Sequence, residues 1–112
     1  MAHDPNAPIP PAEFRVLLAL LDGDKHGHGI KLDIRDRTDG RVDMGPGTLY
    51  GAIKRLAARN WIAEVEAPPA SGERDRRRRF YTLTDEGRTA AKHEARRMEE
   101  LLGIARAKTA EI

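Results

Sequence analysis

The sequence contains no cysteine. It therefore cannot build a disulfide scaffold, a thiolate zinc site or a cysteine nucleophile, and a reducing compartment is the default expectation. Aromatic residues make up only 4% of the chain. The longest apolar run, residues 16–21, is far shorter than the ~20 residues of a membrane span. Residues 1–11 lack the basic start and apolar stretch of a secretory signal, so we expect a cytoplasmic protein with no membrane partner.

One domain, with or without an added helix, is the largest architecture that 112 residues can build around one core. Charged residues make up 34% of the sequence, compared with about 25% in a typical soluble domain. Hydrophobic residues make up 39%. These proportions predict a folded chain with a large hydrated surface.

The net charge of +2 results from an uneven distribution along the chain. Residues 1–40 carry five basic and seven acidic side chains, and residues 80–112 carry six of each. Residues 41–79 carry nine Lys or Arg against five Asp or Glu, with acid-poor stretches at 45–62 and 74–79. Local basic segments of this kind are what a polyanion would contact.

Hydrophobic spacing predicts a flexible tail over residues 1–10 and then a helix from residue 11 to about residue 21. A weaker pattern predicts a second helix over residues 27–36. Residues 41–44 alternate between polar and apolar, which favours a short strand.

The third predicted helix, over residues 46–59, has two different faces. Gly45 and Pro46 suit its N-cap and first position, and Asn60 suits the left-handed residue that ends it. One face is apolar and would pack on the core. The other face is uncharged or positive throughout and consists of Thr48, Gly51, Lys54, Arg55 and Arg59.

An arginine-rich β-hairpin is predicted after the third helix, with strands over residues 61–66 and 76–83. Thr84 then suits the N-cap of a long last helix. The apolar residues of this helix alternate at steps of four and three, which is the spacing of a heptad seam: Ala91, Ala95, Met98, Leu102, Ala105, Thr109 and Ile112.

This order of elements predicts a mainly α fold with a small β-hairpin. Residues 11–83 would form a winged helix-turn-helix domain that binds DNA. Residues 84–112 would form one long C-terminal dimerisation helix.

Three segments resemble the PadR family of transcriptional regulators. Residues 45–50, with 53–56 and the pair at 61–62 after them, resemble the family's recognition-helix signature. Residues 79–87 are similar to its aromatic-x-Leu-Thr-x-x-Gly junction between wing and last helix, and residues 26–30 to its His-Gly-aromatic segment.

The sequence departs from the family pattern at two positions, with His28 in place of an aromatic residue and Asn60 in place of a glycine. The last helix ends at Ile112, which resembles the short-tailed members. The resemblance implies a homodimeric repressor in which this helix packs on the partner's first and last helices. Two-fold symmetry would make its operator a pseudo-palindrome of double-stranded DNA.

A recognition helix needs small or hydrogen-bonding residues in its first turn and cations further along. One interpretation is that Tyr50 packs against its own hairpin and that Lys54 and Arg55 only form a solvated face. The other is that these side chains meet DNA. We expect Thr48, Tyr50 and Lys54 to lie at the major groove. The full predicted set on this helix is Gly47, Thr48, Tyr50, Gly51, Lys54 and Arg55.

The wing is predicted to contact the DNA backbone or the minor groove through Arg74, Arg76, Arg77 and Arg78. Because side chains alternate along a hairpin, about two or three of them can reach one phosphate track at once. Arg79 is expected to be structural because it is close to the core. The alternative is a charged edge that prevents strand-to-strand aggregation.

The last helix is predicted to form a dimer interface, although its seam could instead pack on its own subunit. This interface would comprise Phe14, Leu18, Ala91, Ala95, Met98, Leu101, Leu102 and Ala105. The resemblance also implies an effector pocket there, lined by Phe14, Leu18, Met98, Leu101 and Leu102. Because the last helix contains no Trp, Tyr or Phe, we expect only weak stacking on large planar drugs.

Other functions find less support in the residues. Ser71 is the only serine, and no Ser-His-Asp arrangement or glycine-rich phosphate motif stands out, so we expect no enzyme. His26 and His28, with His3 and His93, are candidate metal ligands, but the spacing of His26 and His28 should place their rings on different faces, so we expect no metal site. We also expect no cofactor. A winged-helix module for protein contacts alone is the main alternative, and salt-sensitive binding to duplex DNA would separate the two.

Overall fold

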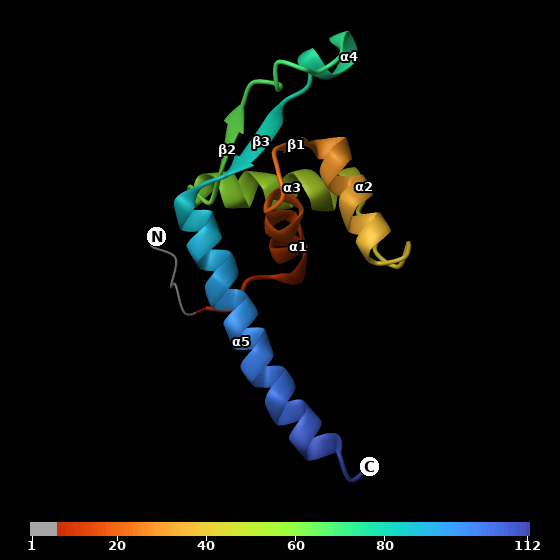
Figure 1. Ribbon diagram of the computed structural model, residues 1–112, viewed down its shortest axis with the longest axis vertical. Coiled ribbons are helices and arrows are strands. Elements are labelled where there is room, and N and C mark those ends of the chain that lie inside the picture. The colour runs from red at the N-terminus through yellow and green to blue at the C-terminus, as the bar shows by residue number, and fades with distance from the viewer. Residues whose placement is uncertain (1–6) are drawn as a thin grey trace.

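The computed structural model describes residues 7–112, and residues 1–6 of the expected tail lie outside that range. Figure 1 shows a body of helices with the wing on one side and the last helix extending from the other. The predicted fold class is confirmed: the chain is mainly helical, with a small antiparallel sheet and a long last helix. The elements are α1 (Pro11–Leu20), β1 (Lys25–His26), α2 (Gly27–Arg37), α3 (Pro46–Ala58), β2 (Ile62–Val65), α4 (Glu73–Arg76), β3 (Phe80–Leu83) and α5 (Asp85–Thr109).

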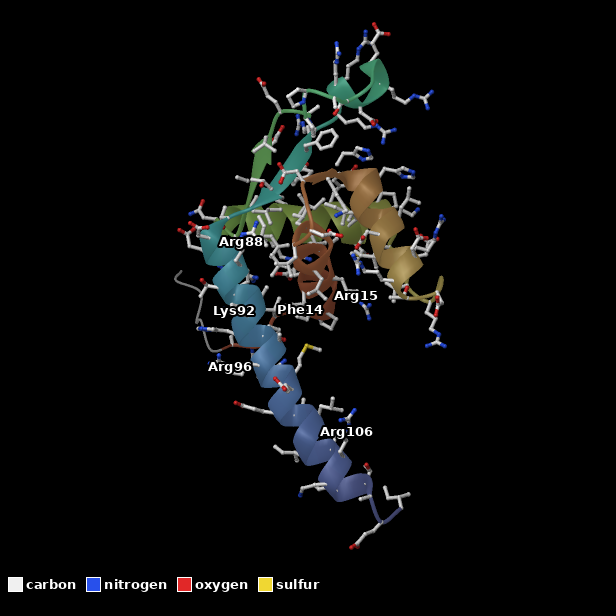
Figure 2. All side chains as sticks on the ribbon, in the orientation of Figure 1. Phe14, Arg15, Arg88, Lys92, Arg96 and Arg106 are labelled. Carbon is white, nitrogen blue, oxygen red and sulfur yellow. The ribbon has the colours of Figure 1, made fainter. Side chains whose placement is uncertain are left out.

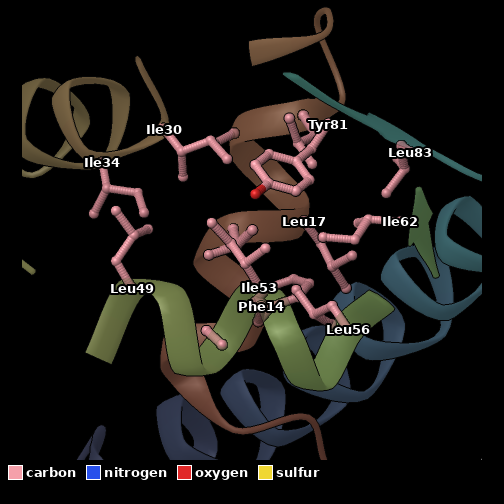
Figure 3. Packing of buried hydrophobic residues seen from close by; sticks show 14 of the residues in the cluster. Phe14, Leu17, Ile30, Ile34, Leu49, Ile53, Leu56, Ile62, Tyr81 and Leu83 are labelled. Atoms are coloured by element: carbon pink, nitrogen blue, oxygen red, sulfur yellow. The ribbon is translucent and has the colours of Figure 1, made fainter. Parts of the chain in front are cut away.

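The core lies between α1, α2, α3 and the sheet (Figure 3). Leu17 of α1, Ile30 of α2 and Leu56 of α3 are completely buried, and Ile62 enters from the sheet. On α1, six of ten residues are buried, which places this helix at the centre with neighbours on most sides. Burial of these side chains is the main favourable contribution to folding.

The sheet has three strands, one more than the predicted hairpin. β3 lies in the middle and pairs antiparallel with β2, with Ile62 opposite Leu83. On its other edge β3 pairs with β1, with Lys25 opposite Tyr81. β1 is only two residues long, so it carries no alternation by which the sequence could reveal it.

One predicted strand is absent, and another begins later than predicted. Residues 41–44 form no strand, because the Val42 N–H donates to Thr38 Oγ1 (3.0 Å) and Met44 is buried in a loop. The second hairpin strand begins at Phe80 instead of residue 76, since residues 73–76 form the short helix α4. The wing arginines therefore do not alternate along a strand.

A tight junction joins the end of α3, the start of β2 and the start of α5. The Thr84 N–H donates to the Trp61 carbonyl (3.0 Å), and the Thr84 hydroxyl donates to the Asn60 carbonyl (2.6 Å). Thr84 Oγ1 also accepts from the Gly87 N–H (3.0 Å), which confirms the predicted N-cap. Asn60 has a φ of 61°, the left-handed conformation predicted for the residue that ends α3. A Cβ at Gly87 would lie 2.0 Å from the Trp61 carbonyl oxygen, so only glycine fits there.

A buried carboxylate links α1 to α3. Glu13 is 2% exposed and accepts hydrogen bonds from Arg55 Nε (3.2 Å) and Arg59 Nη1 (2.5 Å). The Arg59 guanidinium also lies over the Trp61 ring, 5.2 Å from its centroid. A carboxylate is costly to bury unless it is paired, so these two contacts favour one rotation of α3 against α1.

Only the first part of α5 packs on the body of the protein. Ala91 is buried in the core, whereas every residue from 98 to 112 is exposed. No helix among the described residues is both long enough and apolar enough to cross a membrane. The large apolar side chains of α5 that are exposed include Met98, Leu101, Leu102 and Ile104.

We predict that Gly87→Ala destabilises the fold by about 3 kcal/mol, because the added methyl group overpacks the junction against backbone atoms. Gly103→Ala is the matched control in the same helix, since nothing lies within 4 Å of its added Cβ. Alanine is the better helix former, so this control should be as stable as the wild type or slightly more stable. Urea denaturation followed by circular dichroism measures both variants, and equal stabilities would contradict the tight junction.

The α1–α3 link can be tested by removing it from either side. The double variant Arg55→Ala, Arg59→Ala leaves Glu13 buried without a guanidinium, which should cost about 3–5 kcal/mol. Glu13→Gln should cost less, about 1–2 kcal/mol, because both arginines then reach solvent. Chemical denaturation at neutral pH compares the two, and a smaller cost for the double variant would mean that solvent reaches Glu13.

Candidate nucleic-acid interface

α3 presents most of its predicted contact residues on one exposed side. Gly47, Thr48, Tyr50 and Lys54 are exposed, and Gly51 is half-buried. The apolar side of the helix is buried in the core, as predicted. The helix contains no acidic residue, so none of its own side chains repels a phosphate.

Tyr50 reaches from α3 to the start of α2. A Cβ on Gly27 would lie 2.5 Å from the Tyr50 hydroxyl oxygen and 2.9 Å from Cζ, so the absence of a side chain at Gly27 makes room for the tyrosine. The Tyr50 side chain nevertheless stays 52% exposed. It is therefore both held in place and open to solvent.

Arg55 has a structural partner that the sequence pattern does not indicate. Its guanidinium bonds Glu13 of α1, while its side chain remains 54% exposed. Among the residues predicted to contact DNA from α3, it is the one already engaged in an ion pair within the described chain. Its contact with DNA stays a prediction.

The wing arginines lie on α4, at the tip of the wing, and in the loop after it (Figure 1). Arg76 Nε donates to the Ser71 carbonyl (3.2 Å). Arg79 is not structural as expected, because its side chain is 77% exposed and lies 3.6 Å from Glu64 at the surface. Arg78 is the arginine that turns toward the body, where it contacts His26.

Three cations of this region have no partner among residues 7–112. Lys54 of α3, Arg74 of α4 and Arg77 of the following loop form neither a hydrogen bond nor an ion pair there. All three side chains are exposed. They are the cations of α3 and the wing that are free to meet an external anion.

A cleft of about 450 Å³ separates the start of α2 from the wing. His26 is the N-cap of α2, and its Nδ1 accepts from the Gly29 N–H (2.9 Å). Burial raises the pKa of the Tyr81 phenol, which keeps this group protonated and neutral. The cleft is lined by His26, Gly27, His28, Tyr50, Arg78, Arg79 and Tyr81.

The two histidines of this cleft do not lie on different faces, so that prediction is wrong. The His26 and His28 rings are nearly parallel, with centroids 6.4 Å apart. The described residues contain no group of three His, Asp or Glu side chains that could hold a metal ion. Sequence reasoning missed His26 as a residue of this surface. The signal that could have identified it was its position directly before a helix, where its ring nitrogen can act as a cap.

The residues predicted at the dimer interface divide into two groups. Phe14 and Ala91 belong to the core of their own subunit, at 8% and 4% exposed. Figure 2 shows Phe14 on α1 beside α5, with Arg88, Lys92 and Arg96 along α5. The other six are exposed and open to a second molecule: Leu18, Ala95, Met98, Leu101, Leu102 and Ala105.

Comparison with known proteins gives a family match over residues 16–93, to the Transcriptional regulator PadR-like family. A curated relative, an uncharacterized 37.1 kDa protein in transposon TN4556 of Streptomyces fradiae, is 39% identical over 92 residues, which are 82% of this chain. The chain spans only about a quarter (24%) of the length of that relative.

Two solved structures have a similar fold. A transcriptional regulator from Clostridium thermocellum gives a TM-score of 0.75 at 26% identity, covering 88% of this chain and 89% of that one. A PadR family transcription regulator from Clostridium difficile gives a TM-score of 0.73 at 23% identity, covering 85% and 94%. These similarities are to transcriptional regulators and not to enzymes. Because the family match covers α2, α3, the wing and the start of α5, the chain belongs to the PadR-like family of transcriptional regulators.

Proposed function

We propose that this chain binds double-stranded DNA as a sequence-specific transcriptional repressor, with α3 in the major groove and the wing on the backbone or minor groove. The observation that carries the proposal is the set of exposed cations without partners, Lys54, Arg74 and Arg77. Tyr50 of α3 and Arg78 of the wing line the same cleft, so the two elements border one surface.

The first turns of α3 suit close approach to base edges. Gly47 adds no side chain, and the Thr48 hydroxyl can both donate and accept a hydrogen bond. Tyr50 offers a hydroxyl from a ring that is already held against α2. Lys54 follows one turn later, at a position suited to a phosphate.

The apolar side of α5 supports a homodimer. Met98, Leu101 and Leu102 are each about half exposed, at 46%, 55% and 48%, and Leu18 of α1 is 40% exposed. Soluble monomers rarely leave such side chains grouped in water. A second copy of the chain would cover them, and its two-fold symmetry would pair two recognition helices on a pseudo-palindromic operator.

The predicted effector site belongs to this same interface. Phe14 is 8% exposed, so Leu18, Met98, Leu101 and Leu102 would supply most of the lining. All four are flexible and aliphatic or thioether side chains. Such a lining favours an apolar effector of compact shape over a large planar one.

The alternative is a winged-helix module that contacts only proteins. Such a module would not need unpartnered cations on α3 and the wing. Its affinity for a protein partner would not fall steeply as the salt concentration rises. The measurement that separates the two is the affinity for duplex DNA at several salt concentrations. If the logarithm of this affinity falls linearly with the logarithm of the salt concentration, the repressor is favoured over the protein-binding module.

We predict that Lys54→Ala combined with Arg77→Ala weakens DNA binding about tenfold or more and lowers the salt slope by about four, because each of the two subunits loses two cations. The probe is a duplex recovered by sequencing the genomic DNA fragments that the purified wild-type protein retains. Fluorescence anisotropy at several salt concentrations gives both the affinity and the slope.

The matched control removes one lysine and one arginine from α5, as Lys92→Ala combined with Arg96→Ala. Both side chains are exposed and lie away from α3 and the wing (Figure 2). This control should bind like the wild type. Equal losses in the two double variants would mean that only the total charge matters, and would contradict the assigned surface.

We predict that Met98→Glu combined with Leu102→Glu converts the dimer to a monomer and weakens DNA binding. Both positions are exposed, and glutamate is a good helix former, so the helix itself should persist. Light scattering after size-exclusion chromatography measures the mass. Lys92→Glu combined with Arg96→Glu, at the same spacing on another side of α5, should stay dimeric. A dimer that survives the first substitution would rule out this interface.

A further inference from the structure

One side chain, His26, joins the start of α2 to the wing. Arg78 Nη1 lies 3.3 Å from Nδ1 of the His26 ring and 3.3 Å from Nε2. If Nη1 lay in the plane of the ring at 3.3 Å from both nitrogens, it would overlap with the ring carbons bonded to them. The guanidinium nitrogen therefore lies over the face of the imidazole ring.

Other groups hold the His26 ring in this position. Phe80 of β3 meets it edge-on, with centroids 5.1 Å apart and an interplanar angle of 83°. Asp75 Oδ1 lies 3.8 Å from His26 Nε2 and 3.6 Å from Arg78 Nε, so the three side chains form one cluster. The backbone contributes as well, since His26 pairs with Phe80 where β1 meets β3 (Figure 1).

The cap on α2 requires a neutral imidazole. Because His26 Nδ1 accepts the Gly29 N–H, Nδ1 cannot carry a proton, and the ring proton must lie on Nε2. A second proton would have to go to Nδ1. It would remove the cap and place a cation directly against the Arg78 guanidinium.

We propose that His26 is a positioning residue for DNA binding, which in its neutral form holds Arg78 and the wing against α2 and which releases them when it is protonated. The proposal rests on the proposed function, since its consequence is a loss of DNA affinity at low pH. Arg78 lines the cleft beside Tyr50, so its displacement changes the surface that faces the DNA.

The charges around the ring favour the neutral state. Burial first, and then the Arg78 guanidinium and His28, lower the pKa of His26 below its ordinary value of 6.5, while the Asp75 carboxylate acts in the opposite direction. The remaining titratable or charged groups of the cleft are Tyr50, Arg79 and Tyr81. The pKa of His26 is therefore lower in the folded protein than in the unfolded chain. The neutral ring contributes its full stabilisation of the fold above pH 6.5, and this contribution is lost as the pH falls below that value.

The contact between His26 and Arg78 can be tested in the free protein. NMR titration of the histidine ring signals gives the midpoint of His26 in the wild type and in Arg78→Gln. We expect the midpoint to rise in the variant, because the neighbouring cation is gone. The exposed His93 serves as an internal reference that should not move. An unchanged His26 midpoint would overturn the proposed contact.

The effect on DNA is tested with His26→Asn, because asparagine keeps an N-cap acceptor but cannot be protonated. The wild type should lose about fivefold in affinity between about pH 7.5 and about pH 5.5 at constant salt, relative to this variant. The control His93→Asn should follow the wild type. The same pH dependence in the wild type and His26→Asn would show that His26 does not act on DNA binding.

The two experiments also separate this proposal from the proposed function. If the wild type binds no duplex DNA even at about pH 7.5, the proposed function fails, together with any effect of His26 on DNA. The NMR titration would still decide whether His26 and Arg78 act as one unit. If the wild type binds DNA and only the pH difference is missing, the proposed function stands and the role of His26 fails.

Discussion

The carbonyl group of Trp61 fixes how the three functional parts of the chain meet. It accepts the Thr84 N–H at 3.0 Å, and the backbone of Gly87 packs directly against it. Asn60, one residue earlier, ends α3 and accepts from the Thr84 hydroxyl. The end of α3, the base of the wing and the start of α5 therefore share one point. A side chain at position 87 would push α5 away, and with it the apolar surface that the helix carries beyond the body of the protein.

The buried carboxylate of Glu13 is the second constraint on α3. Hydrophobic burial alone allows a helix to rotate about its axis against its neighbours, because the hydrophobic effect is not directional. Two guanidinium groups that must meet one buried carboxylate restrict that rotation. The rotation of α3 about its axis decides which of its residues point outward, so a contact on the core side determines whether Thr48, Tyr50 and Lys54 face the solvent.

The sequence was sufficient for the elements whose signals are local. The apolar spacing of α1 and α3, the Gly45-Pro46 start, the left-handed Asn60 and the Thr84 cap all act within a few residues. β1 could not be predicted, because two residues become a strand only through pairing with a segment more than fifty positions away. The same is true of the site. The sequence indicated the residue types on α3 and the wing, but the partners of Arg55 and Arg78 come from α1 and the start of α2, and Arg79 proved to be exposed.

Net charge describes this surface poorly, because the charges that matter are those left without partners. In the body of the protein, Asp22 lies 2.6 Å from Lys25 and 3.0 Å from Arg37, and Arg37 also bonds Asp33. On α5, basic and acidic residues are interspersed, so positive potential cannot accumulate along it. α3 carries no acid at all, and α4, at the tip of the wing, is followed by three consecutive arginines. The field that an approaching polyanion would meet is therefore concentrated on α3 and the wing, although the total over the chain is only +2.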